Sequence, residues 1–312
     1  MALYETNFQF SENQTFYRGK VRDVYYVDDL FISIASDRIS AFDYILPRAI
    51  PFKGQVLNQV AVHFLEASKH IIPNWLQASP DPNVSIGVRC EPVMIEMVIR
   101  GYLAGHSWRL YKSGERVICG VRMPKGMKEG DKFPTPLVTP ATKAEEGHDE
   151  DISREDIFAR GIVDESIYTK MEEATRALFE MGQEMANEQG LILVDTKYEF
   201  GTHKGDLYLM DEIHTPDSSR YYYSKGYEEK QASGVPQEQL SKEFVREWLM
   251  EHDFQGKDGQ QMPEMPGEFV TAVSERYIQL YELITGKEFI RGTTDNVQDR
   301  IRTNVERYLA SC

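Results

Sequence analysis

Cysteine and long apolar runs are scarce in this 312-residue sequence. Its three cysteines, Cys90, Cys119 and Cys312, are widely spaced and form no CxxC or CxxH pattern, so they support neither a disulfide framework nor a structural zinc site. No apolar run approaches the roughly 20 residues that span a bilayer. The N-terminal stretch "MALYETNFQF" lacks the basic and apolar regions of a signal peptide. We therefore expect a cytoplasmic protein.

Basic residues are the minority among the charged side chains. Thirty-five Lys and Arg stand against fifty Asp and Glu, which gives a net charge of −15 at pH 7. Such a charge disfavours nucleic acid and anionic membrane surfaces as partners. The seven histidines show no HExxH or paired metal-ligand spacing. An anionic ligand would therefore have to be held by local Arg and Lys side chains, backbone amides or metal ions.

The first part of the chain reads as strands with one helix. Residues 22–27 and 30–36 are β-branched and aromatic with two aspartates between them, which predicts a hairpin. Apolar residues then recur at helical spacing from Gln55 to about His70. Two more strands are expected at 83–90 and 93–100, and the Glu-Pro between them marks the expected crossing from one domain to the next.

The second part alternates helices, one hairpin and two expected loops. Apolar residues at spacings of three and four predict a core helix over 164–189. Glycine, proline and mixed charge predict an irregular, lid-like loop over 120–150, and residues 218–240 also read as a loop. Further helices are expected near 240–252, 267–285 and 296–309.

The stretch "LILVDTKYEFG" (191–201) places charge of alternating sign at every second position of a strand. Side chains two apart share one face of a strand, so Asp195, Lys197 and Glu199 should point the same way. If the following turn centres on Gly205, Glu199 lies directly opposite Asp211, at the ~5 Å of a cross-strand pair.

Facing carboxylates repel each other unless a cation lies between them. Mg²⁺ suits such a pair, because it takes one or two carboxylates and completes its shell with water and phosphate oxygens. The alternative is a solvated strand face with alternating salt bridges. The apolar "LILV" favours the first interpretation, because such a run is typical of a buried strand.

Two other segments carry candidate phosphate-binding side chains. Gly19, Lys20 and Arg22 stand at the entrance to a strand, where backbone amides and two cations suit a phosphate, although a hairpin turn would use the same residues. The spacing is not that of a Walker A loop. Ser219 and Arg220 suit bidentate capture of a phosphate, or belong to a turn capped by a preceding aspartate.

Two further groups are equally open. Asp37, Arg38 and Ser40 could form a capped turn or hold an amino-acid or ribose substrate by hydrogen bonds. Arg100 follows an apolar strand, so it either pairs with a core carboxylate or faces a ligand.

Six segments together resemble one family. In chain order they are "YRGKVRDVY", "SDRISAFD", "EMVIRGYLAG", "TPATKAEEGHDE", "LILVDTKYEFG" and "DEIHTPDSSRY". The chain from about residue 15 to 285 resembles the SAICAR synthetases of purine biosynthesis. The resemblance implies that ATP, carboxyaminoimidazole ribonucleotide (CAIR) and L-aspartate give SAICAR, ADP and phosphate, with Mg²⁺ required.

The resemblance also implies a fold of the α+β or α/β class. A small antiparallel β-rich N-terminal lobe like that of kinases, residues 1–91, would cover ATP. A larger α/β domain related to ATP-grasp enzymes, residues 92–312, would bind substrates and metal, with the nucleotide in the cleft between the two. The sequence leaves open whether the protein is a monomer or a homo-oligomer.

Roles follow for individual residues on the same ground. Gly19, Lys20 and Arg22 would bind ATP together with the two magnesium ligands, Glu199 and Asp211. Asp195, Lys197 and Arg100 would act on the reacting groups. The substrate-binding residues implied are Asp37, Arg38, Ser40, Arg100, Ser107, Lys143, Asp149, Glu150, Ser219 and Arg220.

One departure and two alternatives remain. Many family members read Gly-Ser after the Arg100 strand, whereas this chain reads Gly-His-Ser, so either His106 or Ser107 meets the ligand.

The tail from residue 287 lies beyond the resemblance and has no assigned role. A small-molecule or lipid kinase of related architecture, or a catalytically silent nucleotide-binding protein, would share the phosphate-binding features.

Overall fold

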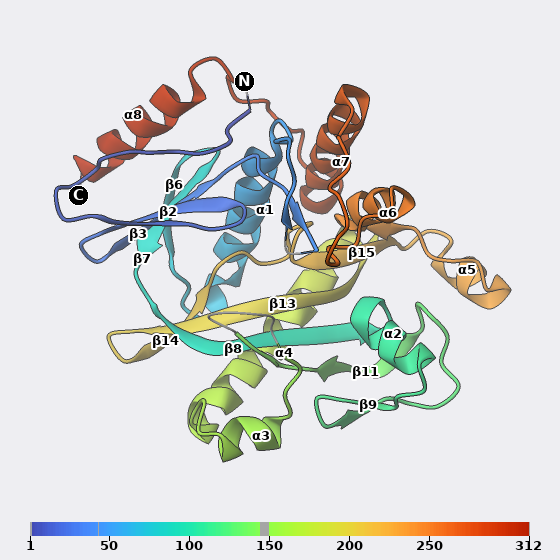
Figure 1. Ribbon diagram of the computed structural model, residues 1–312. Coiled ribbons are helices and arrows are strands. Elements are labelled where there is room, and N and C mark those ends of the chain that lie inside the picture. Colours follow the sequence, from blue (N-terminus) through green and yellow to red (C-terminus); the bar gives the residue numbers. More distant parts are fainter. Residues whose placement is uncertain (1, 43, 144–149, 312) are drawn as a thin grey trace.

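Two large antiparallel sheets, two small hairpins and the surrounding helices make up the described part of the protein (Figure 1). The structure is a computed structural model that describes residues 2–42, 44–143 and 150–311. Asp149 therefore lies outside the described residues. None of the described helices is long and apolar enough to cross a membrane.

The N-terminal sheet has five strands in the order β1-β2-β3-β7-β6. They are β1 (Thr15–Arg18), β2 (Arg22–Val27), β3 (Leu30–Ala35), β6 (Leu76–Asp81) and β7 (Val84–Val88). The predicted hairpin is confirmed, because β2 and β3 pair around an Asp-Asp turn. Between β3 and β6 lie the short hairpin β4 (Ser40–Ala41) and β5 (Tyr44–Ile45), helix α1 (Lys53–Ala67) and the 3₁₀ turn η1 (Ser68–His70).

The second sheet has two long central strands, β8 (Glu91–Tyr102) and β13 (Leu191–His203), which pair with each other. Shorter strands extend it: β11 (Lys132–Val138), β12 (Ala141–Thr142), β14 (Asp206–Met210), β15 (Ser219–Tyr223) and β16 (Gln239–Leu240). The hairpin predicted from "LILVDTKYEF" and "GDLYLMDEIH" is confirmed as β13 and β14.

Helix α4 (Glu165–Glu188) packs against β13 and β8 and confirms the predicted core helix. Met171, Leu178 and Met181 on its apolar stripe are buried. Gly190 follows the helix with a φ of +70°, a left-handed conformation that suits glycine after a helix end.

The remaining helices frame the sheet ends. They are α2 (Gly105–Lys112), α3 (Arg154–Ala159), α5 (Tyr227–Ser233), α6 (Glu243–Glu251), α7 (Gly267–Thr285) and α8 (Val297–Leu309). A small hairpin of β9 (Val117–Ile118) and β10 (Val121–Arg122) follows α2. The three predicted C-terminal helices are thereby confirmed as α6, α7 and α8.

Two expected loops contain regular structure. Residues 120–150 include β11, which pairs with β8 as an edge strand. Its two prolines hid it from sequence analysis, but an edge strand with a register shift tolerates proline because fewer ladder hydrogen bonds are required. Residues 218–240 contain β15, α5 and β16; the tyrosine-rich β15 pairs with β13, so this expected loop was wrong.

Helix α8 packs against the N-terminal sheet, next to the start of the chain (Figure 1). Val297, Ile301 and Val305 share a hydrophobic cluster with Ile32 and Ile34 of β3. The division at residues 91 and 92 stays a prediction. Helix α8 lies at the end of the predicted second domain, residues 92–312, but it packs against the N-terminal sheet.

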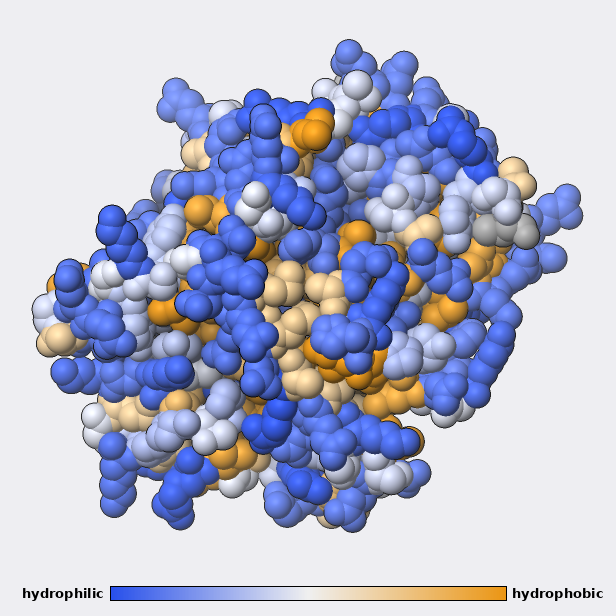
Figure 2. Space-filling model, turned by 180° about the vertical axis from the view of Figure 1, so that it is seen from behind, coloured by the Kyte–Doolittle hydropathy of each residue, from blue (hydrophilic) through white to orange (hydrophobic). Residues whose placement is uncertain are grey.

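The surface is mostly polar, in keeping with the high charge. On the face seen from behind (Figure 2), hydrophilic side chains predominate and hydrophobic ones gather near the middle of the view. The hydrophobic core runs from α1 across the second sheet to α7 as one cluster.

Candidate active site

The central pair of strands carries a charged face. Asp195 lies opposite Arg100 and Glu199 lies opposite Glu96 in the β13–β8 ladder. The Lys197 ammonium lies 2.6 Å from a Glu96 oxygen and 2.7 Å from a Glu199 oxygen. The predicted sharing of one face is therefore confirmed. Salt bridges of alternating sign are also present, but Asp195 and Glu199 are buried and Glu96 is half-buried, so this is not a solvated strand face.

The predicted register of the hairpin was wrong by one residue. His203 pairs with Asp206 across a two-residue turn, so Glu199 lies opposite Met210 and not opposite Asp211. Strand β14 ends at Met210, and Asp211 adopts a left-handed φ of +55°. Burial and then the charge of Glu199 raise the pKa of Asp211 to about 6.

Two lysines balance Glu199. Burial alone would raise its pKa, but the ammonium groups of Lys197 and Lys143 lower it to about 2. Lys143 forms an ion pair with the other oxygen of Glu199. Although burial lowers the pKa of Lys197, its acidic neighbours raise it overall, so the lysine stays charged. This end of the face therefore holds two cations between acidic groups.

Asp195 joins two arginines at the other end of the face. Its Oδ2 atom lies 2.5 Å from Arg220 Nη1 and 3.5 Å from Arg100 Nη1. The Arg100 Nε atom donates to the Thr139 hydroxyl at 2.9 Å. Of the two interpretations left open for Arg100, pairing with a core carboxylate is therefore what the structure shows.

A basic cavity of about 90 Å³ opens beside Arg220. Its lining combines acidic, hydroxyl and cationic side chains with one proline: Asp195, Pro216, Asp217, Ser218, Ser219, Arg220, Ser241, Lys242 and Arg246. Ser219 and Arg220 were expected here, whereas Lys242 and Arg246 were missed. Their i, i+4 spacing at the start of α6 places both on one helix face and was the available signal.

Arg22 links the two sheets at this site. Its Nη2 atom lies 2.5 Å from a Glu212 oxygen, and its Nε atom lies 4.0 Å from an Asp211 oxygen. The turn that contains Gly19 and Lys20 connects β1 to β2 directly before Arg22. Arg22, at the end of the predicted phosphate loop, therefore lies beside one of the two predicted metal ligands, Asp211.

Asp37 and Arg38 lie behind that turn. Arg38 is buried and donates to the carbonyls of Gly19 and Lys20 at 3.0 and 3.1 Å. Asp37 accepts hydrogen bonds from the Leu3 and Gly54 amides, and burial raises its pKa to about 6. Their contact with a substrate stays a prediction.

The remaining predicted residues lie at the edge of the site. Ser40 is buried in β4. Ser107 is buried and donates to the Ala104 carbonyl at 2.9 Å, whereas His106 is partly exposed and its Nε2 atom lies 2.7 Å from Asp151 Oδ2. Glu150 is exposed, and its amide donates to the Thr142 hydroxyl at 3.1 Å.

A buried network that sequence analysis missed supports the basic cavity. Lys53 Nζ lies 3.0 Å from Asp217 Oδ2, Tyr277 donates to Asp217 Oδ1 at 2.6 Å, and Lys242 Nζ lies 3.6 Å from Asp217 Oδ2. Burial opposes ionisation of Asp217, but Lys242 and Lys53 hold its pKa well below the usual range. No local sequence signal shows that Lys53 is fully buried.

Glu199 and Asp211 stay the predicted metal ligands, although both oxygens of Glu199 are paired with Lys197 and Lys143 in this structure. Within the described ranges, no group of three or more His, Cys, Asp or Glu side chains could hold an ion. Two carboxylates suit Mg²⁺, which completes its shell with water and phosphate oxygens. The raised pKa of Asp211 shows the unfavourable charge that a cation would relieve.

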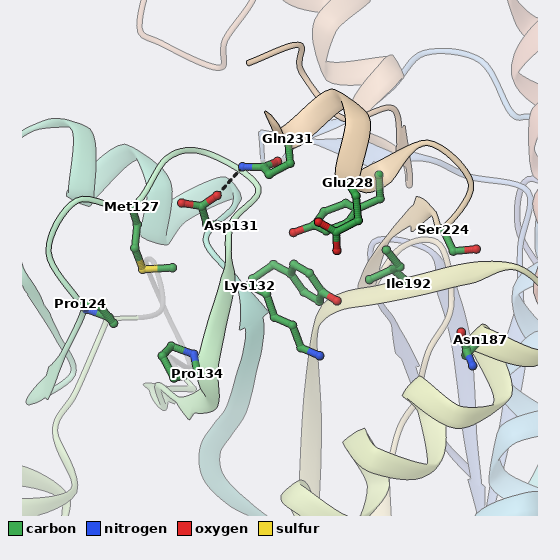
Figure 3. A pocket seen from close by; sticks show the side chains of 12 residues that line it. Pro124, Met127, Asp131, Lys132, Pro134, Asn187, Ile192, Ser224, Glu228 and Gln231 are labelled. Carbon is green, nitrogen blue, oxygen red and sulfur yellow. Dashed lines mark hydrogen bonds between the residues drawn. The ribbon is translucent and has the colours of Figure 1, made fainter. Parts of the chain in front are cut away.

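A larger cavity of about 540 Å³ lies elsewhere, between β8, β11, α4 and α5 (Figure 3). Lys132, Glu228 and Ile192 line it, and an Asp131 oxygen accepts a hydrogen bond from the Gln231 side chain. It contains none of the predicted site residues. We therefore place the candidate site on the charged face and not in this larger space.

Comparisons with known proteins agree with the sequence resemblance. A sequence model of the SAICAR synthetase family matches residues 15–263. Phosphoribosylaminoimidazole-succinocarboxamide synthases of Cytophaga hutchinsonii and Bacteroides thetaiotaomicron are 59% and 57% identical over 308 and 311 residues, which is 99% of each chain.

Solved structures show the same fold. SAICAR synthase from Saccharomyces cerevisiae, described as complexed with SAICAR, is 30% identical with a TM-score of 0.76, covering 91% of this chain and 99% of its own. A type-2 SAICAR synthetase described in complex with ADP is 26% identical with a TM-score of 0.67, covering 88% and 100%.

The chain is thus an enzyme of mixed α/β fold built on antiparallel sheets. Its relatives over the full length carry one enzyme name. The chain belongs to the SAICAR synthetase family, whose members are ligases of purine biosynthesis.

Proposed function

We propose that the protein joins L-aspartate to the carboxylate of CAIR in the cytoplasm, converting ATP to ADP and phosphate. The observation that carries this proposal is the meeting of two features on one charged face. A carboxylate pair, Glu199 and Asp211, lies at one end, and a basic cavity beside Arg220 lies at the other. With Mg²⁺ bound to the carboxylates, the face would neutralise a nucleotide and a phosphorylated substrate at once.

ATP would lie between the β1–β2 turn and the end of β14. Arg22 already spans this gap, and Gly19 permits close approach of the backbone to phosphate. Mg²⁺ held by Glu199 and Asp211 would neutralise charge on the transferred phosphoryl group. The N-terminal sheet would then serve as a kinase-like lobe over an ATP-grasp-like domain. The ADP complex of the 26% identical relative supports binding of an adenine nucleotide.

CAIR would place its 5′-phosphate in the basic cavity. Arg220, Lys242 and Arg246 supply cations there, and serine hydroxyls supply donors. Its imidazole carboxylate would then approach Arg100 and Lys197. The SAICAR complex of the yeast relative supports binding of this class of ligand.

The chemistry must make a poor electrophile reactive. An oxygen of the CAIR carboxylate attacks the γ-phosphorus of ATP, ADP leaves, and an acyl phosphate forms. The uncharged amine of aspartate then attacks the acyl carbon, the bond between that carbon and the phosphate oxygen breaks, and the new amide nitrogen gives up one proton as phosphate leaves. Lys197 stays charged between Glu96 and Glu199 and is fixed to stabilise the phosphoryl oxygens. Lys143, Asp149 and Glu150 remain the residues we expect on the aspartate side.

ADP release tests this function. Full-length protein is assayed with ATP, CAIR and L-aspartate, and then with CAIR or aspartate omitted. We expect ADP and SAICAR to form in equal amounts only when all three are present. A kinase would release ADP without aspartate and keep a stable phosphorylated product, and a silent nucleotide-binding protein would release none; either result would overturn the proposal.

A further inference from the structure

Arg300 on α8 holds a buried turn of the N-terminal sheet. Its guanidinium lies 2.9 and 3.1 Å from the two carboxylate oxygens of Asp81 and donates to Asn83 Oδ1 at 2.6 Å. The Asp81 side chain is fully buried, and Asn304 on the same helix also donates to it at 2.8 Å. The β6–β7 turn is therefore fixed from the C-terminal helix.

Asn83 passes this constraint to the end of β3. The Asn83 side-chain amide donates to the Ala35 carbonyl at 2.9 Å, and the backbone carbonyl of Asn83 accepts from the Ala35 amide at 2.8 Å. Gly54 packs so tightly here that a Cβ atom would lie 2.3 Å from the Ala35 oxygen. Little free space remains for Ala35 to shift.

The residues after Ala35 hold the β1–β2 turn. The Ser36 hydroxyl and amide donate to the Val21 carbonyl at 2.8 and 3.0 Å. Arg38 donates to the Gly19 and Lys20 carbonyls. Three consecutive carbonyls of the turn are thus bonded from residues 36 and 38.

We propose that Arg300 is a positioning residue for ATP: through Asn83 and the 35–38 segment it fixes the β1–β2 turn against the nucleotide phosphates. This inference rests on the proposed function, in which that turn binds ATP. Arg300 lies outside residues 15–263, the part that the family's sequence model matches. It gives the C-terminal tail, which sequence analysis left without a role, a task in substrate binding.

A purely structural role predicts a different result. The apolar side of α8 already attaches it to the sheet through Val297, Ile301 and Val305. If Arg300 only added stability, its loss would lower the melting temperature and leave the KM values unchanged. If it positions the turn, the KM for ATP rises selectively.

The test compares Arg300→Met with Arg302→Met in the full chain. Arg302 is an exposed arginine on the same helix that pairs with Asp299 of that helix, so it controls for the loss of one charge. We expect Arg300→Met to weaken ATP·Mg²⁺ binding by about tenfold and to raise the KM for ATP by about the same factor. The KM values for CAIR and aspartate should stay within about twofold, and Arg302→Met should behave as the unmodified protein.

A double-mutant cycle tests the route. Asn83→Ala should also raise the KM for ATP, and adding it to Arg300→Met should cost little more, because both remove the same connection. Arg300→Met leaves the buried Asp81 carboxylate without its cationic partner. The double variant Arg300→Met/Asp81→Asn is therefore measured as well, because it leaves no unpaired charge.

The outcomes separate the two proposals. Binding of ATP is measured by direct titration, so it does not depend on ligase activity. ATP affinity that stays unchanged in both Arg300→Met and the double variant Arg300→Met/Asp81→Asn would overturn this inference alone. Equal changes in the KM values for ATP, CAIR and aspartate would do the same. Unmodified protein that binds ATP but forms no SAICAR would overturn the proposed function alone, and unmodified protein that binds no ATP would overturn both.

Discussion

Asp211 carries a negative charge that its surroundings balance only in part. It ends β14 in a left-handed conformation, and burial together with the charge of Glu199 raises its pKa to about 6. Arg22 offers partial compensation at 4.0 Å. A carboxylate held ionised near another carboxylate at neutral pH is ready to bind a cation.

Asp211→Asn should abolish most ligase activity. The amide keeps the shape but removes the negative charge that would bind Mg²⁺, so we expect kcat/KM to fall by at least about 10²-fold. Asp206→Asn, at the exposed start of the same strand, is the matched control and should retain activity. Activity of Asp211→Asn within a few-fold of the unmodified protein would rule out Asp211 as a ligand.

The same carboxyl group predicts a pH dependence of nucleotide binding. Protonated Asp211 cannot bind a metal ion, so affinity for ATP·Mg²⁺ should be full above pH 7 and fall as pH drops through about 6. Titrations between pH 8 and 5 measure this. Asp37 also has a pKa near 6, so Asp211→Asn separates the two. An unchanged pH profile in that variant would assign the effect to another group.

At the scale of elements, the Lys53–Asp217 pair joins α1 to the loop before β15. Both side chains are almost fully buried, and Tyr277 of α7 donates to the same carboxylate. Breaking a buried ion pair leaves a charge without compensation.

Lys53→Met should therefore destabilise the protein by about 3 kcal/mol, because Asp217 keeps only the more distant Lys242 as a cationic partner. Urea denaturation measures the free energy of unfolding. Lys69→Met, which removes an exposed pair with Glu66, is the control and should cost less than about 1 kcal/mol. Equal effects of the two substitutions would contradict the assigned role of Lys53.

His214 couples the end of the β13–β14 hairpin to acid stability. It is fully buried beside Tyr198, and burial lowers its pKa to about 3. The unfolded state gains a proton near pH 6.5 that the folded state does not, so stability falls as pH drops below that value. We expect a loss of about 2 kcal/mol between pH 8 and pH 5 from this group. Urea denaturation across that range measures it, and His214→Gln should show a weaker dependence; an equal one would contradict the role.

Strand periodicity allowed part of this site to be predicted. Alternation along β13 is local, so the shared face of Asp195, Lys197 and Glu199 followed directly from sequence. The register to Asp211 did not, because it depends on whether the turn has two or three residues. β11 was missed because its prolines are tolerated only at an edge, which is a property of the sheet.

At the scale of the whole molecule, the proposed function requires a locally positive site on a protein whose net charge is negative. The net charge of −15 disfavours anionic substrates, whereas Arg220, Lys242 and Arg246 gather at one cavity. Distant pairs such as Arg300 with Asp81 connect both ends of the architecture. Such pairs could not be read from sequence, because more than two hundred residues separate their members.

The acyl phosphate route gives the most direct test of the proposed reaction. CAIR labelled with ¹⁸O in its carboxylate is incubated with enzyme, ATP, Mg²⁺ and L-aspartate, and the released phosphate is examined by mass spectrometry. We expect one labelled oxygen in each phosphate, because the carboxylate oxygen that attacks the γ-phosphorus leaves with it. Phosphate without label would show that the carboxylate never carried the phosphoryl group, and would contradict the proposed function.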